Sequence, residues 1–305
     1  MRKISALLLA LLLAMSVFTA CGSSDKGSSD DTKAADPGST AAADGSSAAD
    51  DGAAADSDWS YIEGKGEMIV GITLFAPMNY EDENNELIGF DTELTKAVAE
   101  KLGVKVDFQI INWDNKEVEL QSKNIDCIWN GMCITEERKQ NMGITNPYLN
   151  NTQAMVMKAD RQEEIMKDVS GLTIVAEQGS TGEGKLLGTI EDDDTVEVSA
   201  QEYFKDSTYV PVDSMAKALM EVKAGTADAA LVDSVCALAM VGEGTDYEDL
   251  VVNLDNNFGS QEYGIAFRKG SDMVDKVNNA IKELYAEGVV EEIAAKYGLS
   301  EMLIK

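Results

Sequence analysis

One stretch decides the fold of this chain: residues 113–139, which read WDNKEVELQSKNIDCIWNGMCITEERK. After the leading aromatic, the pattern predicts a short helix over residues 116–123 and a buried strand over residues 125–129. The pair Asn130-Gly131 then breaks the strand into a turn. Helix, strand and turn lead to Arg138, so the stretch predicts an α/β unit with a cation placed just after a strand.

Arg138 and the aromatic Trp113 would suit a small zwitterion. The planar guanidinium can bind a carboxylate through two parallel hydrogen bonds, and the aromatic can cover the apolar part of the same molecule. A plainer interpretation stays open at this point. Arg138 follows Glu136 and Glu137, and most arginines beside acids are solvated surface groups.

The composition narrows the class of partner. The chain has 305 residues, enough for one or two domains, and carries a formal net charge of -30 with a pI of about 4.2. Nucleic-acid binding depends on Lys and Arg side chains that neutralise phosphates, so we expect no nucleic-acid partner. The sequence has no histidine and no close pair of cysteines, so we expect no zinc or other metal site and no cofactor.

Three cysteines fall in the expected folded body: Cys127, Cys133 and Cys236. Cys127 and Cys133 are separated by a strand and a turn, and at about 3.3 Å per residue an extended span places them too far apart for a disulfide. Cys236 lies much further along the chain. We therefore expect three free thiols.

The N-terminus has the pattern of an export signal. Arg2 and Lys3 precede an apolar run over residues 4–18, and the small residues 19–20 come directly before Cys21. This pattern resembles the signal peptide of a lipoprotein. We therefore interpret residues 1–20 as a signal peptide and Cys21 as the lipidated residue. An ordinary signal followed by an incidental cysteine is the alternative.

Residues 21–58 predict a disordered tether. After Cys21 the segment is almost wholly Gly, Ser, Ala, Thr and Asp until Trp59, and such a composition cannot bury enough surface to fold. As a flexible coil it would span roughly 30 to 35 Å on average. No later stretch has enough consecutive apolar residues to cross a bilayer, so lipid on Cys21 is the expected contact with the membrane.

The body from residue 59 onward contains two similar series of strands and helices. Apolar runs and amphipathic spacing predict the first series over residues 68–71, 94–103, 106–110, 116–123 and 125–129. They predict another strand over residues 154–157, and then the second series over residues 172–176, 196–198, 214–223 and 229–232. A strand over residues 263–267 and helices from residue 274 to 297 follow. The fold class is therefore α/β, and two series in one chain favour two lobes.

The wording of residues 113–138, W-D-x(5)-L-Q-S-x-x-I-D-x-I-x-x-G-M-x-I-T-x-E-R, resembles the extracellular solute-binding proteins of the polar amino-acid type. These are the capture subunits of ATP-binding-cassette importers. The resemblance covers roughly residues 66–299 and includes residues 89–91, 178–181 and 263–266 in the same order and spacing.

The resemblance implies a two-lobe clamshell of the periplasmic-binding-protein kind, in which each lobe is a sheet flanked by helices. Residues 59–156 and 262–305 would form lobe 1, and residues 157–261 would form lobe 2. Two hinge strands, near residues 154–160 and 260–267, would join them.

The resemblance also assigns the groups that would bind the zwitterion. Arg138 matches the arginine that grips the ligand's α-carboxylate, and Asp233 matches the acid that pairs with its α-ammonium. Ser180 and Thr181 match a turn of the opposite lobe that supplies hydroxyl and backbone donors. Ser180, Thr181 and Asp233 could instead be plain helix caps.

Other positions of the resemblance would surround the ligand's side chain. Phe75 and Trp113 match aromatic residues that sandwich it, although large aromatics are more often ordinary core. The turn matched by Asn130, Gly131, Met132 and Cys133 would offer carbonyls and small polar groups.

Two departures bear on the choice of ligand. The loop of residues 72–75 is one residue shorter than usual and lacks the aspartate that members binding basic amino acids place there. Glu177 stands where many relatives have an apolar residue. We therefore expect a neutral or polar amino acid rather than a basic one, with Glu177 as a possible source of compensating charge.

These inferences predict a monomeric protein that captures a free amino acid in a cleft between the lobes and delivers it to a membrane permease of an ATP-binding-cassette importer. It would be held on the outer side of the cell membrane, or in the periplasm of a cell with an outer membrane. Two rivals use the same fold. A dehydratase-like enzyme would have to work without histidine, and a ligand-sensing ectodomain would need a spanning segment that this sequence does not provide.

Overall fold

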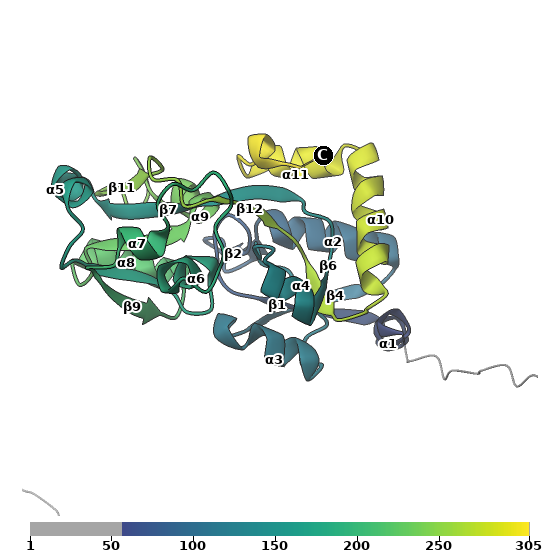
Figure 1. Ribbon diagram of the computed structural model, residues 1–305. Helices are drawn as coiled ribbons and strands as arrows, with labels where there is room; N and C mark the ends of the chain where they lie inside the picture. The colour runs from purple at the N-terminus through teal and green to yellow at the C-terminus, as the bar shows by residue number, and fades with distance from the viewer. Residues whose placement is uncertain (1–56, 305) are drawn as a thin grey trace, which may run out of the picture. The chain divides into compact units, whose positions relative to one another are not determined.

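The computed structural model describes residues 57–304 of the chain (Figure 1). The predicted signal peptide, Cys21 and nearly all of the predicted tether lie outside the described residues. The described part contains two main sheets, both flanked by helices. None of its helices is long and apolar enough to cross a membrane.

The first sheet contains the decisive stretch of the sequence. Its strand order is β4-β1-β5-β13-β6, with β1 parallel to β4 and β5, and with β13 antiparallel to β5 and β6. Its strands are β1 (Glu67–Ile72), β4 (Lys105–Ile110), β5 (Cys127–Ile128), β6 (Met142–Ile144) and β13 (Ala266–Arg268). A small hairpin of β2 (Tyr80–Glu81) and β3 (Leu87–Ile88) stands apart from it.

Hydrophobic clusters cover both faces of the first sheet. Successive side chains of a strand point to opposite sides, so a single strand can contribute to both clusters. Met68 and Val70 of β1 pack in one hydrophobic cluster with Leu94 of α2, whereas the intervening Ile69 packs against a second cluster that contains Leu120 of α3. The helices on this side of the protein are α1 (Asp58–Lys65), α2 (Phe90–Leu102), η1 (Trp113–Asn115), α3 (Lys116–Gln121), α4 (Glu136–Asn141), α10 (Met273–Ala286), α11 (Val289–Lys296) and η3 (Ser300–Met302). The predicted range of residues 94–103 ends where α2 ends, because Gly103 follows the helix in the left-handed region at φ +74°.

The second sheet has the order β11-β7-β10-β8-β9, and β12 pairs with β7 beside this path. Its strands are β7 (Leu149–Lys158), β8 (Thr173–Glu177), β9 (Thr208–Val212), β10 (Ala229–Asp233), β11 (Leu250–Asn253) and β12 (Ser260–Tyr263). Its helices are η2 (Ala159–Arg161), α5 (Gln162–Lys167), α6 (Thr181–Leu187), α7 (Ala200–Tyr203), α8 (Met215–Ala224) and α9 (Ser234–Met240). Strands β8 and β10 are parallel neighbours.

Both faces of the second sheet are also buried. Ala230 and Val232 of β10 pack with α8 and α9, and the alternate residues Ala229 and Leu231 pack with α5, α6 and α7. One strand was predicted in the wrong place: residues 196–198 form no strand, and β9 pairs with β8 instead. Val198 is exposed, so its apolar side chain does not pack into a core that would hold a strand here.

Two neighbouring strands run between the sheets. Residues 149–152 of β7 pair antiparallel with residues 260–263 of β12, and β13 then re-enters the first sheet. The part of β7 that pairs with β12 is residues 149–152, which precede the predicted hinge strand near residues 154–160. The following residues of β7 pair with β10 and β11 of the second sheet. The predicted lobe boundaries stay predictions.

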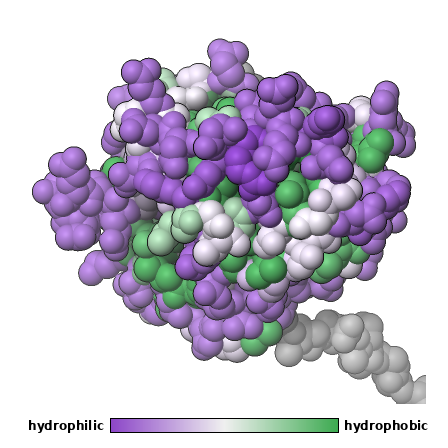
Figure 2. Space-filling view, turned by 90° about the vertical axis from the view of Figure 1, so that its left-hand side faces the viewer, coloured by the Kyte–Doolittle hydropathy of each residue, from purple (hydrophilic) through white to green (hydrophobic). Residues whose placement is uncertain are grey.

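The face seen in Figure 2, on the second-sheet side, is covered mostly by hydrophilic side chains, with apolar ones gathered in smaller areas. This agrees with the acidic composition of the chain.

Candidate functional site

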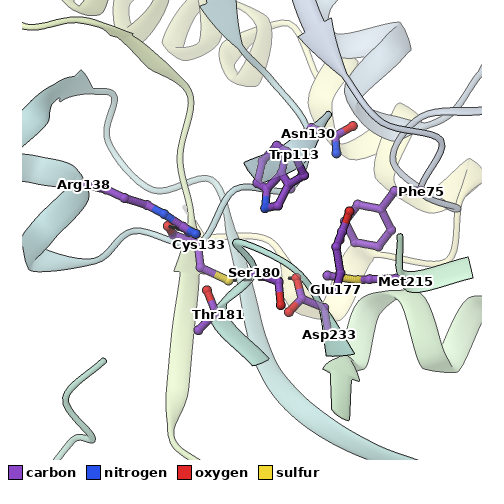
Figure 3. A pocket seen from close by; sticks show the side chains of 11 residues that line it. Phe75, Trp113, Asn130, Cys133, Arg138, Glu177, Ser180, Thr181, Met215 and Asp233 are labelled. Atoms are coloured by element: carbon purple, nitrogen blue, oxygen red, sulfur yellow. Dashed lines mark hydrogen bonds between the residues drawn. The ribbon is translucent and has the colours of Figure 1, made fainter. Parts of the chain in front are cut away.

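One cavity brings together residues from both sheets. It is lined by Phe75, Trp113, Asn130, Gly131, Cys133, Arg138, Glu177, Ser180, Thr181, Met215 and Asp233 (Figure 3). These are all the ligand-binding residues predicted from the sequence except Met132, together with Met215, which was not predicted. The free space is about 10 Å³, which is roughly the room for one water molecule.

Arg138 is buried in this cavity rather than solvated. It lies on α4, where Thr135 caps the helix by accepting a hydrogen bond from the Arg138 backbone N–H. Its side chain donates from Nη1 to the Cys133 carbonyl at 2.7 Å and from Nη2 to the Gly179 carbonyl at 3.1 Å. Its neighbour Glu136 pairs with Lys139 instead. Within residues 57–304 the guanidinium has neutral acceptors but forms no ion pair, so its charge remains available to an anion.

Lys116 is a second buried cation beside Arg138, and no local sequence pattern distinguishes it from a surface lysine. Its Nζ donates to the Trp113 carbonyl at 3.1 Å and to the Gly179 carbonyl at 3.0 Å, and it lies 4.8 Å from the centre of the Trp113 ring. Burial, followed by the charge of Arg138, lowers the pKa of Lys116 to about 7.

Asp233 ends strand β10 and begins α9, but its side chain does not cap that helix. Its Oδ2 accepts a hydrogen bond from the Tyr263 hydroxyl at 2.7 Å, and its Oδ1 accepts one from Gln153 Nε2 at 2.5 Å. The helix-cap interpretation is therefore wrong for this side chain. Burial raises the pKa of the Asp233 carboxyl, and the hydrogen bonds from Tyr263 and Gln153 partly oppose that rise.

Glu177 ends β8, the parallel neighbour of β10, so both acids lie at the same edge of the second sheet. Its side chain is buried, and Oε1 has no hydrogen-bond partner among the described residues. Burial, and then the charge of Asp233, raise the pKa of Glu177 to about 8. Figure 3 shows Glu177 near Phe75 and Met215, on the other side of the pocket from Arg138.

Ser180 and Thr181 differ in what their hydroxyls do. The Ser180 hydroxyl accepts a hydrogen bond from the Glu183 backbone N–H, so the helix-cap interpretation holds for this residue. The Thr181 hydroxyl is buried and has no partner within the described residues. Thr181 is thus the free hydroxyl of this turn.

The turn after β5 is fixed from three sides. Asn130 accepts hydrogen bonds from the Thr73 backbone N–H at 3.0 Å and from the Asn79 side chain at 2.8 Å. Gly131 has φ +54° and donates its N–H to Asp91 at 2.7 Å. A Cβ at this glycine would come within 2.6 Å of the Phe75 ring, so only glycine fits here.

Met132 is the predicted site residue that does not line the cavity. Its side chain is fully buried in the hydrophobic cluster that contains Leu120 and Ile128. The neighbouring Cys133 does line the cavity, with Sγ 3.2 Å from Gln261 Oε1. Burial raises the pKa of Cys133 to about 12, so this thiol stays protonated near neutral pH.

The three cysteines of the described residues are all free, as predicted. No group of three or more His, Cys, Asp and Glu residues there could hold a metal ion.

Phe75 and Trp113 serve as both core and cavity wall. Each is buried in a hydrophobic cluster, and each also lines the cavity. Met215 begins α8, where an apolar residue is typical of the hydrophobic core. No local sequence signal therefore marks it as a cavity residue.

The fold and the site together define a class: a two-lobe α/β binding protein whose cavity combines a buried guanidinium with buried carboxylates. The chain belongs to the bacterial extracellular solute-binding proteins, family 3, whose sequence model matches residues 68–300.

Relatives in this family carry amino-acid-binding names. The chain is 29% identical over 239 residues to the arginine-binding extracellular protein ArtP of Bacillus subtilis, covering 78% of this chain and 88% of ArtP. It is 28% identical over 240 residues to the L-cystine-binding protein TcyJ of Escherichia coli, covering 77% and 84% of the two chains.

Solved structures agree on the fold. A Streptococcus pneumoniae substrate-binding protein of an ABC uptake transporter with bound histidine has a TM-score of 0.70 at 30% identity, covering 82% of this chain and 99% of the other. An ancestral amino-acid-binding protein described as a precursor of cyclohexadienyl dehydratase has a TM-score of 0.66 at 28% identity, covering 79% and 99%.

Proposed function

We propose that this protein captures a free amino acid outside the cell and delivers it to the permease of an ATP-binding-cassette importer. One observation carries the proposal: Arg138, from the first-sheet side, and Asp233, from the second, line the same buried cavity. A cation and an anion on opposite walls match the two poles of an α-amino acid.

In this proposal each wall holds one pole of the ligand. The Arg138 guanidinium binds the α-carboxylate, and the Asp233 carboxylate binds the α-ammonium. Gln153 and Tyr263 already hold Asp233 from the strands that run between the sheets, so its carboxylate is oriented in advance. Phe75 and Trp113 flank the ligand's side chain, and Thr181 offers a free hydroxyl.

Capture requires the walls to part. A free space of about 10 Å³ is too small for any amino acid, so the ligand enters a more open arrangement and is then enclosed. Because the ligand touches both walls only when they are closed, it shifts the equilibrium toward the closed form. Movement between residues 59–156 with 262–305 and residues 157–261, about β7 and β12, would supply this closure.

The anchoring proposal rests on the sequence of residues 1–58. Removal of the signal at residues 1–20 would leave Cys21 to carry lipid on the outer side of the membrane, or in a periplasm. Residues 21–58 would then hold a monomeric binding body away from the surface.

The cavity does not support the expected preference for neutral over basic amino acids. That expectation depends on the missing aspartate in residues 72–75, but Glu177 brings a carboxyl group with an unpaired oxygen to the same cavity from the opposite wall.

A dehydratase-like activity is the second candidate, favoured by the structural neighbour that preceded a dehydratase. The two functions differ in the fate of the ligand. Incubation of each bound amino acid, followed by mass spectrometry, separates them: an unchanged amino acid supports capture, and a converted one supports catalysis.

The direct test is a thermal-shift screen of the full chain against the twenty amino acids and cystine, followed by calorimetry. A ligand at a hundred times its Kd stabilises the folded state by about 2.7 kcal/mol, which raises the melting temperature by several degrees. We expect one chemical group of amino acids to produce this rise. If no amino acid does, the capture function is wrong.

A further inference from the structure

Glu177 is a buried acid that lacks a partner. Its side chain is only 4% exposed, Oε1 accepts no hydrogen bond, and the carboxylate forms no ion pair within residues 57–304. Buried polar groups in native proteins are almost always satisfied, and an unpaired buried carboxylate destabilises the fold. A donor supplied by a ligand would satisfy this group.

Lys116 does not fill that role. Its Nζ donates to the carbonyls of Trp113 and Gly179 and faces the Trp113 ring. The charges of Lys116 and Glu177 act on each other's pKa, but no ion pair joins the two side chains within the described residues. The carboxylate of Glu177 therefore stays available inside the cavity.

The three charged groups of the cavity lie where one kind of molecule could meet all of them. Figure 3 shows Arg138 on one side of the pocket and Glu177 beside Phe75 on the other, with Asp233 lower in the view and nearer to Glu177 than to Arg138. An amino acid with its carboxylate on Arg138 and its ammonium on Asp233 would extend its side chain toward Glu177. Phe75 and Trp113 line that part of the cavity, and aromatic faces attract cations.

We propose that Glu177 forms the side-chain subsite of this cavity and selects an amino acid whose side chain ends in a guanidinium or ammonium group. This inference rests on the proposed capture function and names its substrate class. A neutral side chain would leave the Glu177 carboxyl without a charged partner, and an acidic side chain would place like charges together. The acid missing from residues 72–75 is thus replaced from the opposite wall of the cavity.

The test compares near-isosteric ligands that differ in charge. Calorimetry of the full chain would use L-arginine and L-lysine against the neutral L-citrulline and L-glutamine. We expect the wild-type protein to bind arginine or lysine at least about 30-fold more tightly than the neutral ligands, because a charge-assisted hydrogen bond is worth more than a neutral one.

Variants of Glu177 test whether this side chain causes the preference for a cationic ligand. Glu177→Gln keeps the size of the side chain but removes its charge, and it should reduce the preference for the cationic ligand by about tenfold or more. Glu177→Asp keeps the charge and should keep the preference. Glu163→Gln, an exposed acid on α5, makes the same chemical change far from the cavity lining and should bind like wild type.

The outcomes separate this inference from the capture function. If the wild-type protein binds only neutral amino acids, or if Glu177→Gln keeps the full preference for arginine over citrulline, the subsite is wrong while capture stands. If no amino acid binds, both the capture function and the Glu177 subsite are wrong. The wild-type comparison of arginine with citrulline decides the inference even if a variant does not fold.

Discussion

The Nη2 atom of Arg138 lies 3.1 Å from the carbonyl oxygen of Gly179. Arg138 belongs to α4 on the first-sheet side, and Gly179 precedes α6 on the second. Lys116 donates to the same oxygen, so one backbone carbonyl joins two buried cations to the opposite wall. The group that we assign to the ligand's carboxylate therefore also stabilises the closed cavity.

We predict that Arg138→Ala lowers amino-acid affinity by at least about 100-fold, because it removes a charge-assisted, two-point contact. Arg138→Lys should recover only part of this loss, since an ammonium cannot form two parallel hydrogen bonds. Calorimetry measures both effects. The exposed neighbour Lys139→Ala is the control, and equal losses in Lys139→Ala and Arg138→Ala would contradict a specific contact.

Asp233→Asn should lower affinity to a similar degree, because a neutral amide cannot pair with the α-ammonium. Its partners Tyr263 and Gln153 are donors, so the amide can still accept one of their hydrogen bonds and the fold should remain. Asp275→Asn, an exposed change on α10, provides the control. Unchanged affinity in Asp233→Asn would remove this acid from the binding site.

Gly131→Ala should destabilise the protein by roughly 2 kcal/mol or more and weaken binding. The added Cβ would lie 2.6 Å from Phe75 Cε1 and 3.0 Å from Tyr263 Cε2, on a backbone with φ +54°. Gly103→Ala is the matched control, since it also has positive φ, +74°, but meets nothing within 4 Å. Urea unfolding of both variants isolates the contribution of the clash, and equal destabilisation would contradict it.

The preference for arginine over citrulline should increase from about pH 6 to about pH 8. Glu177 has a pKa raised to about 8 and Lys116 a pKa lowered to about 7, so rising pH makes the site more negative. The other charged groups that act on Glu177 are Asp233 and Arg138. The increase should not exceed about tenfold per pH unit. Calorimetry over this range checks it, and a flat or falling ratio would show that Glu177 does not meet the ligand's cation.

Asp91→Asn should change how stability depends on pH. Burial raises the pKa of Asp91 to about 7, so its neutral form is favoured in the folded state, and the stability it contributes at low pH is lost as pH rises toward 7. Between about pH 5 and about pH 8 the wild type should lose roughly 2 to 3 kcal/mol relative to Asp91→Asn. Urea unfolding at both pH values measures this difference.

The exposed change Asp107→Asn on β4 is the control for that experiment and should follow the wild type at both pH values. A constant difference between the wild type and Asp91→Asn would mean that Asp91 is not neutral in the folded protein.

The sequence by itself determined much of the second sheet. Alternate apolar residues in β7 and β10 supply two separate clusters, because a buried strand must satisfy both of its faces. Local sequence also predicts the turn at Asn130 and Gly131, where a glycine with positive φ follows the strand. It failed at residues 196–198, because alternating apolar residues become a strand only when a neighbouring strand is available to pair with them.

The tertiary structure alone decided how the site is charged. Arg138 could be buried or solvated on the sequence evidence, and only packing against residues far along the chain buried it beside the Gly179 carbonyl. The role of Lys116 has no local sequence signal, because its partner Gly179 is 63 residues away in sequence. Glu177 became significant only when its carboxyl proved to be buried without a partner. Local patterns fix which residues belong to a strand or turn, but the charge of a buried site depends on distant groups that only folding brings together.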